Sequence, residues 1–210
     1  MKLYDFPLAA NAQRVHVFLA EKGLVLDREE VNIRQGEQFN APFSTMNPFH
    51  CVPVLELDNG TIIAESLSIC RYLEELHPTP SLFGRTPEER AVIEMWGRRM
   101  ELDAFIPLLH ALRNQAPMFA GRVIPGTRSD LPQAPEIVAR GIEMMEIFLS
   151  RLDPHLEKNA FLAGSQFSVA DITGFFTMRL AGAVGMKFEV KFPNTSRWFA
   201  DISARPSFKL

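Results

Sequence analysis

The residues best suited to hold a small ligand lie between positions 51 and 66. Residues 51–55 form an apolar segment with Pro53 inside it, and proline is tolerated in a sheet only at an edge, a strand start or a bulge. Glu65 and Ser66 then open a run with helical spacing. A carboxylate can bind an amine, and a hydroxyl beside the free N–H groups of a helix N-terminus can bind an anion. The order predicts a site for a ligand with an amine and exposed polar backbone.

The elements that position these groups follow from short-range patterns. Asn59-Gly60 between two apolar runs is a strong signal for a hairpin. Upstream we expect strands at residues 2–5 and 25–33, a helix at 11–22 stopped by Gly23, and a short helix at 39–46. A β-α-β half followed by a β-β-α half is thioredoxin-like topology. We therefore expect a thioredoxin-like domain over residues 1–79, with Pro53 starting its third strand.

The second half is expected to be entirely helical, over residues 87–210, after a proline-rich linker at 77–84. Thr86 and Pro87 predict a helix start, and Pro107 should kink that helix. Ser168 and Asp171 have capping-box spacing, with Asp in place of the usual Glu. The remaining expectations are a loop at 122–135 and helices at 136–156 and 196–203.

Composition excludes several classes of protein. The net charge of −3 and the lack of a Lys/Arg-rich run argue against a nucleic-acid partner. No stretch has the length of a membrane span or the pattern of a signal peptide. Cys51 and Cys70 are the only cysteines, and they show no metal-type spacing. We therefore expect a cytoplasmic protein with no metal and no membrane partner.

The chain as a whole resembles the cytosolic glutathione S-transferases, especially bacterial and fungal members. The resemblance rests on Val-Pro-Val-Leu at 52–55, Glu65-Ser66, the proline-rich linker, the helical second half and Ser-Val-Ala-Asp at 168–171, in that order. It implies a glutathione co-substrate, a small hydrophobic electrophile as second substrate, a role in detoxification and a homodimer.

The resemblance also implies how glutathione is held. Glu65 would face the amine of the γ-glutamyl group, while Ser66 and its helix N–H groups would face the α-carboxylate. Val52, whose backbone groups are freed by Pro53, would pair with the cysteinyl part as an added strand. His50 matches a position that faces the glycine carboxylate in related transferases. The alternatives are that Ser66 only caps its helix and that His50 is only solvated.

One departure from the family pattern concerns activation of the glutathione sulfur. Many members carry Tyr-x-x-x-x-Ser near the N-terminus, and here Tyr4 is followed by Ala9 where the serine would stand. No cysteine lies in that loop either. Asn11, expected as the N-cap of the first helix, is our candidate catalytic residue and a further glutathione contact. Capping alone is an equally weighted alternative for Asn11.

Leu8, Phe105 and Asn114 are expected to line the electrophile pocket, by their place in the family pattern. The expected reaction is conjugation of the glutathione thiolate to small hydrophobic electrophiles. Glutathione-dependent peroxide or disulfide reduction would use the same site, and isomerisation of a dienone-type acid is a further alternative. A rival of another class is a non-catalytic binding or regulatory protein, for which Ala9 is the best support.

Overall fold

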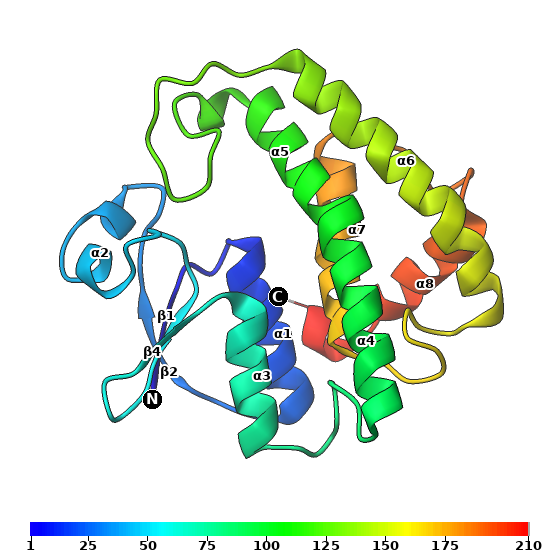
Figure 1. Ribbon diagram of the computed structural model, residues 1–210, viewed down its shortest axis with the longest axis horizontal. Helices are drawn as coiled ribbons and strands as arrows, with labels where there is room; N and C mark the ends of the chain where they lie inside the picture. The colour runs from blue at the N-terminus through cyan, green and yellow to red at the C-terminus, as the bar shows by residue number, and fades with distance from the viewer. Residues whose placement is uncertain (210) are drawn as a thin grey trace. The chain divides into compact units, whose positions relative to one another are not determined.

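The computed structural model describes residues 1–209, which form two compact units. The first comprises Met1–Pro80 and Pro125–Thr127, and the second comprises Ser81–Ile124 and Arg128–Lys209. A four-stranded mixed sheet with helices makes up the first unit, and the second is helical (Figure 1). The predicted fold class is confirmed.

The sheet has the strand order β2-β1-β3-β4. β1 (Lys2–Asp5) runs parallel to β2 (Asp27–Glu30) and antiparallel to β3 (Val54–Glu56), which pairs antiparallel with β4 (Ile62–Ala64). β2 is shorter than the predicted strand at 25–33. It lies at the sheet edge and all four of its residues are exposed, so burial does not extend the pairing.

The predicted hairpin between β3 and β4 is confirmed. Gly60 has a φ of 82°, and the Thr61 N–H donates to the Asn59 side-chain oxygen over 3.0 Å. The Leu57 N–H donates to the Thr61 carbonyl at the base of the turn. Glycine is needed at such a positive φ, which is why this dipeptide identified the turn.

Helices cover both faces of the sheet. α1 (Ala10–Lys22) and α3 (Ser66–Leu76) lie together on one side of the strands, and α2 (Phe43–Met46) lies on the other (Figure 1). Gly23 ends α1 with a φ of 65°, as expected. The short helix expected at 39–46 is divided into a 3-10 helix, η1 (Glu37–Phe39), and α2.

The second unit begins with a helix that changes its winding before Pro107. α4 (Pro87–Arg99) opens with a capping box between Thr86 and Glu89. A π-helix, η2 (Met100–Phe105), connects it to α5 (Ile106–Gln115). Proline lacks an N–H and its ring clashes with the preceding turn, so the widened turn occurs where the sequence predicted a kink.

The remaining elements are η3 (Pro117–Phe119), α6 (Pro135–Lys158), α7 (Val169–Ala183), α8 (Pro193–Ser203) and η4 (Pro206–Phe208). Asp171 connects α7 to α8 and to the segment that precedes α7. The fully buried Asp171 carboxylate accepts hydrogen bonds from Leu162 N–H, Ser168 N–H and Oγ, and Trp198 Nε1. Burial raises the pKa of Asp171 to about 6, against the lowering effect of these donors. Its predicted capping role is confirmed.

Across residues 1–209, no helix has the length and apolar character needed to cross a membrane.

Candidate functional site

The start of α3 has an unusual backbone. Glu65 occupies the N-cap position with φ 66° and ψ 122°, and no side chain caps the helix. A positive φ is rare for a residue with a β-carbon and costs about 1–3 kcal/mol, which proteins retain mainly at functional sites. Ser66 is the first helical residue and is buried. The alternative that Ser66 only caps the helix is therefore wrong, because Ser66 is not the N-cap and no described side chain caps the first N–H groups of α3.

Arg14 connects this helix start to α1. Its side chain is 2% exposed, and its Nη1 lies 3.4 Å from the Ser66 Oγ, toward which it donates. A guanidinium beside a helix N-terminus adds positive charge where an anionic ligand group would bind. Arg14 is a candidate binding residue that the motifs of the sequence did not identify. The feature that could have indicated it is the position of this charged residue between Ala12 and Val15, which both lie on the buried face of α1.

The start of α1 corrects the expected position of Asn11. The N-cap is Ala9, whose N–H donates to the Phe6 carbonyl and whose carbonyl accepts from the Gln13 N–H, each over 2.9 Å. Asn11 is therefore the second helical residue and does not cap. Its side-chain Oδ1 is buried without a hydrogen-bond partner in the described chain. The alternative of capping alone is removed, and the catalytic role of Asn11 stays a prediction.

Val52 and Pro53 directly precede β3. The sheet ladder begins at Val54, so the backbone groups of Val52 lie outside it, and the Val52–Pro53 peptide bond is cis. The Val52 side chain belongs to a core cluster against which Ala9 packs. Ala9, the N-cap of α1, and Val52, the residue proposed to pair with a peptide ligand, therefore meet at the same hydrophobic cluster.

His50 lies in the turn before Val52 and has a φ of 51°. Its Nδ1 lies 3.2 Å from the carbonyl oxygen of Gly126, and its ring centroid lies 5.0 Å from that of Phe39. The alternative that His50 is only a solvated loop residue is wrong, because its ring is held by these two contacts.

The residues predicted to line the electrophile pocket differ in exposure. In the first unit, the Leu8 side chain is 60% exposed. In the second unit Phe105 and Asn114 are buried. The Asn114 amide donates to the His110 carbonyl and accepts from the Ala134 N–H, each over 2.9 Å. The second bond fixes Ala134, the residue before α6. Both the nitrogen and the oxygen of the Asn114 side chain are therefore already hydrogen-bonded within the protein.

Cys70 is not accessible as a nucleophile for disulfide exchange. Cys70 is fully buried, and burial raises the pKa of its thiol well above the ordinary range. Cys51 is partly buried and forms no disulfide. The described residues contain no cluster of His, Cys, Asp or Glu side chains suited to hold a metal ion.

Comparisons with known proteins show the family to which the chain belongs. The family model for the glutathione S-transferase N-terminal domain matches residues 10–76, and the model for the C-terminal domain matches residues 134–206. Glutathione S-transferase 2 of Saccharomyces cerevisiae is 32% identical over 211 residues, covering 100% of this chain and 88% of that protein. Glutathione S-transferase F10 of Arabidopsis thaliana is 32% identical over 207 residues, covering 97% and 92% respectively.

A solved structure supports the same relationship. The crystal structure of a glutathione S-transferase domain-containing protein from Marinobacter aquaeolei VT8 has a TM-score of 0.90 and 32% identity, with 100% of each chain covered. These matches span all 210 residues of this chain. The chain belongs to the glutathione S-transferase family of enzymes.

Proposed function

We propose that the protein binds glutathione in the domain of residues 1–79 and transfers its thiolate to small hydrophobic electrophiles. The observation that carries this proposal is the contact between Arg14 and Ser66. It joins the second turn of α1 to the first residue of α3, which supports a site in which two helix N-termini would serve one ligand. One terminus would bind the γ-glutamyl carboxylate and the other would stabilise the thiolate.

The peptide part of glutathione would be held by the roles expected from the family pattern. The exposed Glu65 carboxylate would pair with the ligand amine, and Ser66 with the α-carboxylate. The Val52 N–H and C=O would bind the cysteinyl residue as an added strand before Pro53. His50 would bind the glycine carboxylate. The strained φ of Glu65 supports a ligand role over a merely structural one.

Thiolate formation in this site does not depend on a serine. Moving a thiol pKa from about 8.5 to near 7 needs only about 2 kcal/mol of differential stabilisation. The N-terminus of α1 has no side-chain cap, and Asn11 lies on its first turn. The helix N–H groups and the Asn11 amide together could supply this stabilisation.

The chemistry would combine this stabilisation with positioning. The thiolate attacks an electrophilic carbon, a C–S bond forms, and the leaving group departs with its electron pair or an added carbanion takes up a proton. No covalent enzyme intermediate is involved. Leu8, Phe105 and Asn114 would contribute to the site for the electrophile, and detoxification is the role that this chemistry suits.

We further propose a cytoplasmic homodimer. Exposed apolar side chains recur along α4, η2 and α5 at Val92, Met95, Leu102 and Ile106, which is unusual for a solvated helix face. Light scattering coupled to size-exclusion chromatography should give about twice the chain mass of 23.7 kDa. A monomer at all accessible concentrations would contradict this part of the proposal.

The test of the proposed function is a pH titration of bound glutathione, followed by thiolate ultraviolet absorbance. A thiol pKa well below that of free glutathione supports the transferase. Tight binding with an unshifted pKa and no turnover on a panel of electrophiles supports the non-catalytic alternative, which Ala9 favours. The same panel should include a peroxide and a small disulfide, because reduction would need only a different acceptor.

A further inference from the structure

A segment far along the chain packs against the turn that carries His50. Pro125–Thr127 belongs to the first unit although its chain neighbours belong to the second. Gly126 has a φ of 67°. A β-carbon added to Gly126 would overlap the Phe49 carbonyl oxygen and lie 2.9 Å from the Cys51 sulfur. Only glycine fits this conformation and this close approach.

The same residue makes the polar contact with His50. The Gly126 carbonyl lies 3.2 Å from Nδ1 and can only accept, so Nδ1 carries the proton. With Nδ1 taken by this contact, Nε2 is the nitrogen that remains for a ligand, and it donates to an anionic group when that group binds the ring in its protonated form. The Gly126 carbonyl therefore determines which histidine nitrogen is available.

The turn that bears His50 is itself fixed from the other side. The buried Asn47 donates from Nδ2 to the Cys51 carbonyl over 2.8 Å, and its Oδ1 accepts from the Phe49 N–H over 3.2 Å. The His50 N–H donates to the Asn47 carbonyl. Three contacts therefore hold His50: its backbone N–H bonds to Asn47, its ring packs beside Phe39, and its Nδ1 contacts the Gly126 carbonyl. Such preorganisation lowers the entropic cost of binding a ligand.

We propose that Gly126 is a positioning residue for the glycine end of glutathione, acting through His50. This inference rests on the proposed function and deepens it, because it assigns discrimination between glutathione and shorter thiols to one contact. The cysteinyl part is assigned to Val52, and His50 lies two residues before it. A ligand that lacks the glycine carboxylate, such as γ-glutamylcysteine, gains nothing from the positioned imidazole.

The test measures the dissociation constants of glutathione and γ-glutamylcysteine by calorimetry on the intact protein and on Gly126→Ala. The variant should weaken glutathione binding by roughly tenfold or more, the loss expected for one hydrogen bond to a charged group, and leave γ-glutamylcysteine binding unchanged. Gly121→Ala is the matched control. Gly121 has a φ of 70° in the same loop, but an added β-carbon meets only the Ser129 carbonyl at 3.6 Å.

A second variant tests the same inference if Gly126→Ala fails to fold. His50→Gln keeps an amide donor near the position of Nε2 but cannot donate to Gly126 from the Nδ1 position. It should lose the preference for glutathione in the same way. Unchanged glutathione binding by either folded variant would overturn the inference, as would an equal loss for both ligands, which indicates a structural role. Failure of the unsubstituted protein to bind glutathione would instead overturn the proposed function, and the inference with it.

Discussion

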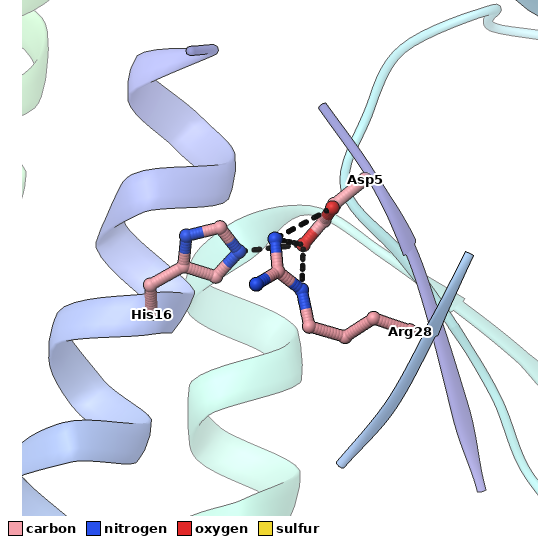
Figure 2. Close-up of polar contacts among 3 residues, drawn as sticks. All are labelled: Asp5, His16 and Arg28. Atoms are coloured by element: carbon pink, nitrogen blue, oxygen red, sulfur yellow. Dashed lines mark hydrogen bonds and ion pairs between the residues drawn. The ribbon is translucent and has the colours of Figure 1, made fainter. Parts of the chain in front are cut away.

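His16 Nε2 lies 2.5 Å from the carboxylate of Asp5, which the Arg28 guanidinium also contacts with two hydrogen bonds of 3.0 Å (Figure 2). Asp5 ends β1, His16 lies on α1 and Arg28 lies on β2, so one buried carboxylate joins three elements. Burial by itself raises the pKa of Asp5, but the hydrogen bonds from His16 and Arg28 outweigh it, and the pKa is lowered.

Asp5→Asn is expected to destabilise the protein by about 2 kcal/mol, below the roughly 3–5 kcal/mol for breaking a fully buried pair, because Arg28 is partly solvent-exposed. A lowered folded pKa means that the unfolded chain binds the proton first on acidification. The stabilisation is therefore complete above the ordinary value of 3.8 and is lost as pH falls through the folded pKa. Urea unfolding from pH 7 to pH 3 measures both effects.

The matched control for Asp5 is Glu29→Gln on the same two strands. Glu29 pairs with Lys2 over 3.0 Å, but both side chains are about half exposed, so solvent screens the pair. This variant should leave the unfolding midpoint unchanged at pH 7. Equal changes in the unfolding midpoint for the two substitutions would show that the Asp5 cluster stabilises the protein no more than an exposed ion pair does.

Gly174→Ala should destabilise the second unit by about 1–3 kcal/mol through overpacking. An added β-carbon would lie 2.5 Å from Trp198 Cη2, and the fully buried indole cannot move away. Gly182, also on α7, has open space around it, so Gly182→Ala should stabilise by about 0.5–1 kcal/mol through helix propensity. Thermal unfolding compares the pair, and a destabilised Gly182→Ala alongside a neutral Gly174→Ala would contradict the packing argument.

Glu65→Gly is expected to weaken glutathione binding while raising stability. Releasing the positive φ returns about 1–3 kcal/mol, and the entropy of the added glycine costs about 0.5–1 kcal/mol, for a net gain of about 1 kcal/mol. Glu65→Ala also removes the carboxylate but keeps the strain. It should lose the same affinity without the gain in stability, as judged by calorimetry and urea unfolding. Wild-type affinity in both variants would remove Glu65 from the site.

Asn11→Ala should raise the pKa of bound glutathione and lower turnover without loss of stability, because alanine is the better helix former. Asn11→Asp should raise that pKa further, since a carboxylate repels the thiolate. Stopped-flow absorbance and steady-state kinetics give the two readouts. Intact glutathione affinity and turnover in Asn11→Ala would refute the role of Asn11.

Local signals were sufficient to predict much of the fold. Asn59-Gly60 identified the hairpin, and the pairs Thr86–Glu89 and Ser168–Asp171 identified two helix starts. These features depend on hydrogen bonds between residues two or three positions apart, so the sequence specifies them directly. The family pattern likewise named Glu65, Ser66 and Val52 in advance, although their roles in binding remain to be tested.

Long-range packing decided the rest. Asn11 is a good N-cap residue by propensity, yet the N-cap of α1 lies two residues earlier at Ala9, which packs against the core cluster that contains Val52. The burial of Arg14 against Ser66 joins residues 52 positions apart, and the contact of His50 with Gly126 spans 76. No local pattern encodes such pairs, because their energy depends on close packing between distant segments. The sequence alone thus determined the order of elements and the candidate residues, whereas the tertiary structure decided which of them meet.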